Sequence, residues 1–287
     1  MTDKLDQKQG KILNIGIDST TATRVLTFVR DSLKRGHKFY IVTPNPEIVL
    51  ESSKDLELTR ILNNADISIP DGVGLCIANE FLHKPIVPKS VSWFIYPIQW
   101  FASSVNRGKG ALNPMTIIKG RQLFLDLIKL ANKKGLRVYL FGGIDGATIK
   151  AKENLEKSFK SIRIETGEPG MYGKNGEPIS ESDISKEIDI VKHINNFKPD
   201  ILFVALNTPK QEKFIDRLMP KLNIGGAMTV GGTINYVAGL SKVPPRFIGE
   251  SGFEWLWRLI TEPWRVKRIL NALFVFPSRV ISSKPTK

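Results

Sequence analysis

A short and almost entirely apolar run recurs along this chain, and a segment long enough for a helix separates each run from the next. In the clearest run, residues 201–206, all six residues are apolar. Such a run suits a strand with both faces buried, because neither face of that strand meets water. The pattern predicts an α/β fold whose doubly wound, mainly parallel, Rossmann-like sheet is covered by helices on both faces.

The order of the predicted elements supports this fold class. We predict strands at residues 12–17, 39–42, 67–69, 137–141, 162–164, 201–206 and 227–230. We predict helices at residues 20–34, 46–63, 121–134, 147–159, 184–196 and 209–218. With 287 residues, of which 41% are hydrophobic, the chain is long enough to bury a complete core.

Glycine pairs directly follow two of the predicted strands: Gly142 with Gly143, and Gly231 with Gly232. Glycine lets backbone N–H groups approach a phosphate, and the next helix presents its positive end. Because the carboxyl ends of parallel strands meet at one edge of a sheet, we interpret these glycines as part of a nucleotide-binding site. The alternative is the tight turns that every α/β fold needs. The dinucleotide fingerprint G-x-G-x-x-G is absent, which argues against a dehydrogenase.

The formal net charge of +14 calls for a polyanionic partner. Much of the excess lies in residues 242–287, where nine Lys and Arg residues face three Glu residues and large aromatic residues lie between them. We therefore predict a main Rossmann-like domain at residues 1–242. Residues 243–287 would form a basic helical appendage that meets an anionic membrane surface. A nucleic-acid-binding protein is the alternative, but no helix-turn-helix, zinc-finger or RNP-like pattern supports specific binding.

The chain has one cysteine, Cys76, a polar N-terminus, and no apolar run near the ~20 residues that a membrane-spanning helix needs. We therefore expect a cytoplasmic protein, either soluble or peripheral on the membrane. The three histidines, His37, His83 and His193, are scattered and lack the spacing of metal ligands. We predict no metal site.

Six stretches of the chain, in the same order, resemble the WecG/TagA/CpsF glycosyltransferase family. They are TPNPEIV (43–49), ADISIPDGVGL (65–75), VYLFGG (138–143), PDILFVALNTPKQE (199–212), VGGTINYVAG (230–239) and GFEWLWRLITEPWRVKR (252–268). The resemblance implies that residues 1–242 are a catalytic domain for an inverting sugar transfer. The sugar is typically N-acetylmannosamine or a related hexose derivative, and its UDP form is the donor. The acceptor is typically a polyprenyl-diphosphate-linked sugar at the inner face of the cell membrane, in the synthesis of teichoic acids and related polysaccharides.

The resemblance also assigns roles to single residues. Asp71 would be the catalytic base, with Thr43 and Asn45 in the same pocket, and Gln211 would contact the substrate. A carboxylate at a strand end can take the proton of the attacking hydroxyl, which adds about 10²–10⁴-fold in rate. The alternative for Asp71 is an aspartate that only stabilises a turn or a helix end. Asp66 lies before its strand, and we interpret it as a polar bracket.

Arginines are expected to balance the charge of the departing UDP. Arg258, Arg265 and Arg268 match the arginines of the family that close over the donor diphosphate. No D-x-D motif stands at a predicted strand end, so these arginines would replace a divalent ion, and no cofactor beyond the UDP-sugar is expected. The alternative is a solvated basic face on an amphipathic helix.

The chain departs from the family pattern at three positions and in one segment. Ile118 and Gln122 stand where the family has an arginine and an aspartate, and Asn235, in a stretch expected to bind the nucleotide, replaces a second aspartate. These changes leave open an altered donor, or a degenerate member that scaffolds a polysaccharide assembly and has lost its activity. A homo-oligomer is also possible.

The segment of residues 84–119 is longer than its counterpart in the family and contains the aromatic run VSWFIYPIQWFA (91–102). We interpret this run as an interfacial loop beside the acceptor entrance; the alternative is a buried lid or a subunit contact. In the appendage, four apolar residues are candidate membrane anchors: Trp264, Leu270, Phe274 and Phe276.

Overall fold

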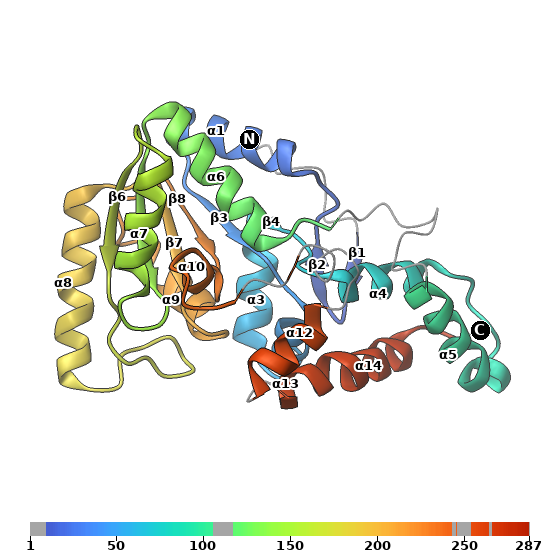
Figure 1. Ribbon diagram of the computed structural model, residues 1–287. Helices are drawn as coiled ribbons and strands as arrows, with labels where there is room; N and C mark the ends of the chain where they lie inside the picture. The colour runs from blue at the N-terminus through green and yellow to red at the C-terminus, as the bar shows by residue number, and fades with distance from the viewer. Residues whose placement is uncertain (1–9, 106–116, 243–244, 246–253, 264–265, 287) are drawn as a thin grey trace.

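The computed structural model describes residues 10–105, 117–242, 245, 254–263 and 266–286 (Figure 1). Its centre is a six-stranded sheet in the order β4-β3-β8-β7-β5-β6, and all neighbouring strands in it are parallel. The strands are β3 (Phe39–Val42), β4 (Ile67–Ser68), β5 (Arg137–Gly142), β6 (Arg163–Gly167), β7 (Ile201–Ala205) and β8 (Gly226–Thr229). The predicted parallel α/β sheet is confirmed.

Helices cover both faces of this sheet, as a doubly wound fold requires. The helices on one face are α1 (Ala22–Arg35), α6 (Gly120–Lys134), α7 (Ala147–Ser158) and α10 (Thr233–Val237). Those on the other face are α8 (Glu181–Phe197) and α9 (Lys210–Leu218). Along β7, Ile201 and Phe203 pack under the first group, whereas Leu202 and Val204 pack under the second. Both faces of β7 are therefore buried, which is why its sequence is apolar throughout.

The prediction that residues 12–17 form a strand of the parallel sheet was wrong. These residues belong to a separate antiparallel hairpin of β1 (Gly10–Ile12) and β2 (Ile15–Ile17). The turn between them places Leu13 and Asn14 at positive φ, a backbone conformation that asparagine tolerates better than most residues. The short polar interruption at Asn14 was the signal for this turn.

The predicted helix over residues 46–63 is two helices, α2 (Pro46–Ser52) and α3 (Leu56–Asn64). The break occurs because the side chain of Asp55 accepts a hydrogen bond from Leu58 N at 2.9 Å and so begins a new helix. Asp66, before β4, accepts a hydrogen bond from Tyr40 N at 2.8 Å. Its predicted role as a polar bracket between neighbouring strands is confirmed.

A second lobe combines segments from the two ends of the described chain. It contains the β1–β2 hairpin, α2, α3, α4 (Val73–His83) and α5 (Lys89–Val105), together with the C-terminal α14 (Phe276–Ser283). The π-helix η2 (Asn271–Val275) leads into α14. Phe276 and Val280 of α14 are fully buried in this lobe. Phe276 is therefore not a membrane anchor, because its ring packs against Trp100 at 6.3 Å between ring centroids.

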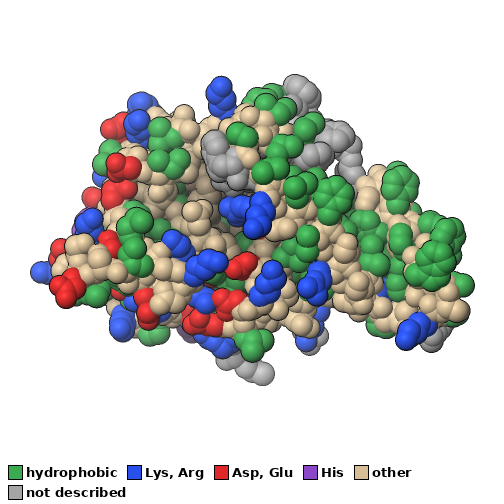
Figure 2. Space-filling view, turned by 90° about the horizontal axis from the view of Figure 1, so that it is seen from below, with side chains coloured by type: hydrophobic (Ala, Val, Ile, Leu, Met, Phe, Trp, Pro, Cys, Tyr) green, Lys and Arg blue, Asp and Glu red, His purple; other side chains and the backbone are tan. Residues whose placement is uncertain are grey.

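The aromatic run at residues 91–102 is helical, so the predicted loop was wrong. It lies in α5, a helix of 17 residues that contains Pro97. One side of α5 packs inward through Tyr96, whereas Trp93 and Phe101 are exposed. In Figure 2 hydrophobic side chains gather at the right-hand end of the molecule, which is the end that carries α5 in Figure 1.

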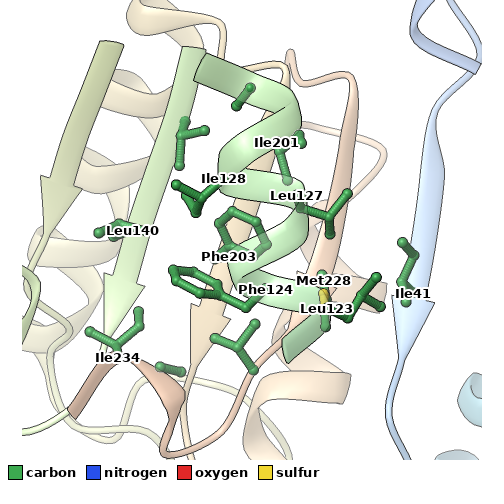
Figure 3. Packing of buried hydrophobic residues seen from close by; sticks show 14 of the residues in the cluster. Ile41, Leu123, Phe124, Leu127, Ile128, Leu140, Ile201, Phe203, Met228 and Ile234 are labelled. Carbon is green, nitrogen blue, oxygen red and sulfur yellow. The ribbon is translucent and has the colours of Figure 1, made fainter. Parts of the chain in front are cut away.

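The largest core lies between α6 and the sheet (Figure 3). Phe124 of α6 points at Phe203 of β7, and their ring centroids are 4.6 Å apart. Leu127 and Ile128 fill the next turn of the same helix. Because α6 packs so closely on the sheet, its N-terminus is held at the carboxyl ends of the strands, where the candidate site lies.

Candidate functional site

A cleft of about 550 Å³ opens at the carboxyl ends of the strands, where the sequence predicted a nucleotide site. The loops after β3, β4, β5, β7 and β8 line it, and the C-terminal segment contributes Glu262 and Arg268. The predicted site residues that line the cleft are Thr43, Asn45, Asp71, Gly143, Gln211, Gly231, Gly232, Asn235 and Arg268. The cleft thus brings together residues from stretches more than 200 positions apart in the chain.

Three predicted site residues are not placed in this cleft. Gly142 is the last residue of β5, with φ at +96°, and a Cβ there would lie 2.6 Å from Ala205 O. Gly142 is therefore needed for the close approach of β5 to β7 rather than for lining the cleft. Arg265 lies outside the described residues. Arg258 belongs to α12 (Glu254–Thr261), but its side chain also lies outside the described part.

Asp71 lies in the turn after β4 and faces the start of α6. Its backbone N donates to Pro44 O at 2.9 Å, and Gly120 N donates to its carboxylate Oδ1 at 3.1 Å. Gly72, which follows, has φ at +91°, a conformation that favours glycine. The P-D-G turn therefore fixes this carboxylate at the wall of the cleft, on the first N–H group of α6.

Asn45 contributes to the cleft mainly as a helix cap. Its Oδ1 accepts hydrogen bonds from Glu47 N and Ile48 N, both at 3.0 Å, which begins α2. Thr43 lies nearer to α6, because a Cβ on Gly120 would meet Thr43 Oγ1 at 3.4 Å. Thr43 and Gly120 thus form one continuous wall beside Asp71.

The glycine loops line the cleft, but several of their N–H groups are already used within the protein. Gly143 N donates to Ala205 O at 2.7 Å, and Gly231 N donates to Gln211 Oε1 at 3.2 Å. Ile144 N donates to Asn235 Oδ1 at 2.9 Å. A phosphate in this cleft would therefore find its positive partners mainly among side chains.

Within the described part of the chain, four cationic side chains line the cleft: Lys119, Arg121, Lys210 and Arg268. Lys119 and Arg121 lie at the start of α6, and Lys210 is the first residue of α9. A helix N-terminus disfavours positive charge by about 0.3–1 kcal/mol per residue, so cations there run against the helix dipole. A bound anion would relieve this repulsion. Of these four, only Arg268 was predicted, although the unusual charge at the helix starts was visible in the sequence.

Two contacts orient the arginines. The Arg121 guanidinium carbon lies 5.3 Å from the centroid of the Tyr236 ring, and both residues line the cleft. Arg268 belongs to α13 (Val266–Leu270), and its Nε donates to Glu47 Oε2 of α2 at 2.7 Å. The second contact ties the C-terminal segment to the rim of the sheet.

The departures from the family pattern affect the cleft less than the sequence suggested. Ile118 is buried in the core beneath α6, and Gln122 is exposed and donates to Asp126 Oδ1 at 3.0 Å. Neither lines the cleft. Asn235 does, and its Oδ1 accepts the hydrogen bond from Ile144 N that an aspartate could also accept. Arg121 supplies a cation three residues after the position that lacks the expected arginine.

Gln211 is held in place by a buried carboxyl group that sequence reasoning did not assign. Its Nε2 donates to Glu212 Oε1 at 2.8 Å, and Thr208 Oγ1 donates to the same oxygen at 3.2 Å. Glu212 is 1% exposed, and this burial raises the pKa of its carboxyl group to about 7. Glu212 thus holds the Gln211 side chain, which in turn accepts the hydrogen bond from Gly231 N in the loop after β8.

The raised pKa of Glu212 predicts a stability that depends on pH. Between the ordinary value of 4.5 and about 7, the native Glu212 holds a proton that the unfolded chain has released. The free energy of unfolding should therefore fall as pH rises through this window and level off above it. Replacing the carboxyl by an amide, Glu212→Gln, removes this fall in the free energy of unfolding, which is roughly 3 kcal/mol across the window. Chemical denaturation across this pH range measures it.

The matched control for this prediction is Glu153→Gln, on the exposed side of α7, which should keep the wild-type dependence on pH. If Glu212→Gln showed the same fall in unfolding free energy as the wild type, Glu212 would not be the group that titrates.

The described residues contain neither a metal-binding cluster nor a membrane-spanning helix. In this part of the chain, no three His, Cys, Asp or Glu side chains gather in a way that could hold a metal ion. No helix among the same residues is both long enough and apolar enough to cross a membrane.

Comparison with known proteins matches this chain to a glycosyltransferase family and to several of its relatives. Residues 10–112 and 96–287 match the profile of the Glycosyl transferase WecG/TagA/CpsF family. An N-acetylglucosaminyldiphosphoundecaprenol N-acetyl-beta-D-mannosaminyltransferase of Bacillus spizizenii is 26% identical over 255 residues, which is 89% of this chain and 84% of that protein.

Two further relatives carry the same name. The protein of Bacillus subtilis is 26% identical over 80% of this chain and 75% of its own length. That of Staphylococcus aureus is 23% identical over 95% of this chain and 92% of its own length. The matches extend from the β1–β2 hairpin to the C-terminal helices. The chain belongs to the WecG/TagA/CpsF family of glycosyltransferases.

Proposed function

We propose that this chain is an inverting glycosyltransferase that moves a sugar from a UDP-sugar to a polyprenyl-diphosphate-linked acceptor without a metal ion. The sugar is N-acetylmannosamine or a related hexose derivative. The names of the relatives support a lipid-linked acceptor and this sugar. The observation that carries the proposal is that the Asp71 carboxylate, held at the wall of the cleft on Gly120 N, and four cationic side chains of the described residues meet in a single cleft at the sheet rim. Glu262, from the C-terminal segment, is a second carboxylate in its lining.

The chemistry follows from this arrangement. The acceptor hydroxyl oxygen attacks the anomeric carbon of the donor sugar, while the bond from that carbon to the diphosphate oxygen breaks. Asp71 takes the proton of the hydroxyl, and UDP leaves with the electron pair of the broken bond. A single displacement of this kind inverts the anomeric centre, and it needs only one base.

The cations serve the leaving group. UDP gains negative charge as the bond breaks, and preorganised positive groups stabilise charge that develops in the transition state. Lys119 and Arg121 from α6 and Arg268 from α13 line the cleft that Asp71 also lines. Guanidinium groups suit a diphosphate, because their planar donors match its oxygens in pairs. No cofactor besides the donor substrate is part of this proposal.

The lipid-linked acceptor also supports a location. We propose that the protein works in the cytoplasm, peripheral on the inner face of the cell membrane, in the synthesis of teichoic acid or a related cell-surface polysaccharide. The acceptor's polyprenyl chain stays in the bilayer, so the cleft has to meet the acceptor at the membrane surface. We propose the active transferase rather than the degenerate scaffold, and the hydrogen bond that Asn235 accepts from Ile144 N at the cleft supports this choice.

The direct test is a transfer assay with the purified full chain. A panel of UDP-sugars is offered with an undecaprenyl-diphosphate N-acetylglucosamine analogue, and nucleotide release is measured with and without EDTA. We expect release of UDP from at least one donor, only when acceptor is present, and at the same rate with the chelator. Release from no donor would contradict the transferase, and loss of activity with EDTA would contradict the metal-independent step.

A further inference from the structure

Helix α5 presents to solvent a face made almost entirely of apolar side chains. Its exposed apolar residues, with their exposed fractions, are Trp93 (76%), Phe101 (68%), Val105 (64%), Phe94 (55%), Ile98 (50%) and Val91 (44%). The only charged residue of the helix is Lys89, at its first position. Soluble monomers rarely expose a contiguous apolar surface of this kind without a partner for it.

The opposite side of α5 is already fixed to the rest of the lobe. The Tyr96 ring packs against Phe81 at 5.9 Å between centroids, and its hydroxyl donates to Pro285 O. Lys284 Nζ donates to Gln99 Oε1 at 2.9 Å and to Phe81 O at 2.7 Å. The helix therefore cannot bury its outer face by rolling inward, because its inner face holds the C-terminal segment in place.

The charge of the two segments that meet at α5 has one sign. Residues 81–125 contain no Asp or Glu but six Lys and Arg residues, and residues 263–287 also contain no Asp or Glu but six Lys and Arg residues. These two acid-free segments meet where α5 packs against α14. In Figure 2 the Asp and Glu side chains lie in the left half of the view, away from the end that carries α5. An apolar face set in acid-free, basic surroundings is complementary to anionic headgroups over a hydrocarbon layer.

We propose that the exposed face of α5 docks on a bilayer that contains anionic lipids. The helix lies in the plane of the interface, with Trp93, Phe94 and Phe101 at the boundary between headgroups and acyl chains and with the exposed Lys89, at the start of the helix, among the headgroups. Trp and Phe are common on the apolar face of helices that lie at this depth of a membrane. A second copy of the chain fits the face less well, because two copies of a face whose flanking segments carry Lys and Arg but no Asp or Glu would repel each other.

This inference deepens the proposed function and rests on it for its biological purpose, because it places the cleft of a transferase beside the layer that holds its acceptor. Its test measures lipid binding, so a failed transfer assay and a failed docking assay are distinguishable. The docking surface lies in the aromatic run at residues 91–102, which we interpret from its sequence as interfacial, and it is separate from the basic appendage at residues 243–287.

The test is flotation of the full chain with vesicles of equimolar phosphatidylglycerol and phosphatidylcholine, compared with vesicles of phosphatidylcholine alone. We expect the triple variant W93S/F94S/F101S to bind the anionic vesicles at least about tenfold less than the wild type, since three large apolar side chains no longer insert. The matched control I149S/I184S/I188S removes three similarly exposed isoleucines from α7 and α8 and should bind as the wild type does. The wild type should bind phosphatidylcholine alone about tenfold less.

A second measurement covers the case in which the triple variant fails to fold. Phe101→Cys carries an environment-sensitive fluorophore, and Ile188→Cys carries the same label as a control. The native Cys76 does not react, because it is buried and its burial raises the pKa of the thiol to about 12. We expect a blue shift with anionic vesicles at position 101 and none at position 188.

Two results would overturn the docking. One is a label at position 101 that keeps its aqueous emission while the protein floats with the vesicles. The other is a triple variant that still floats like the wild type but changes from oligomer to monomer, which would make the face of α5 a subunit contact.

Discussion

Replacing the carboxylate of Asp71 by an amide, Asp71→Asn, is expected to lower kcat/KM of sugar transfer by about 10²–10⁴-fold. The amide oxygen can still accept the hydrogen bond that Gly120 N donates to the carboxylate at 3.1 Å, so the start of α6 should keep its position. The amide cannot take the proton of the acceptor hydroxyl. Binding of UDP should change little, since the cations that would meet the diphosphate remain.

Nucleotide release and a titration with UDP measure the two quantities separately, and thermal unfolding checks the fold. Asp126→Asn is the matched control, because Asp126 lies on α6 outside the cleft and accepts a hydrogen bond from Gln122. We expect the control to turn over like the wild type. A variant of Asp71 that kept more than about a tenth of the activity would remove this residue as the base and leave it the role of a turn residue.

Removing two cations from the cleft, in the variant R121A/R268A, is expected to reduce turnover of the UDP-sugar by about 10²–10³-fold. Each guanidinium lines the cleft from a different side, one from α6 and one from α13. With both gone, the departing UDP loses two of the four positive groups described there. Steady-state kinetics with varied donor measures this loss, and kcat should fall because the charge develops in the transition state.

Two controls separate the loss of charge from the loss of structure. Arg60→Ala removes an exposed arginine that pairs with Asp216 at 2.7 Å outside the cleft, and it should leave turnover unchanged. Glu47→Gln removes the ion pair that holds Arg268 but keeps the guanidinium. If Arg268→Ala costs no more than Glu47→Gln, then Arg268 only tethers the C-terminal segment and does not act on the diphosphate.

The sheet could be predicted from the sequence because a strand that is buried on both faces has apolar residues at every position. β7 is the clearest case, since Leu202 and Phe203 face opposite helical layers and both must be apolar. The same reasoning failed at residues 12–17, where a turn of two residues, Leu13 and Asn14, interrupts an apolar run. An apolar run indicates that a strand is buried, but it does not show whether the strand belongs to a parallel sheet or to a hairpin.

Residues of the candidate site could be predicted only where they lie in a stretch that matches the family. Resemblance to the family identified Asp71 and Gln211, and both line the cleft. Arg121 was treated only as the start of a helix, because the direction of its side chain depends on how α6 packs against the sheet. The position of α5 was equally hidden, since its apolar residues serve both the inner contact and the exposed face.

The packing of α14 determines when the second lobe can fold during synthesis of the chain. Phe276 and Val280 complete an apolar cluster whose other buried members come from the first hundred residues of the chain. During synthesis, domains generally fold as units from the N-terminus onward. Here the second lobe cannot complete its core until α14 has left the ribosome. A polypeptide that stops before Phe276 would therefore keep an open apolar surface, which chaperones and proteases recognise.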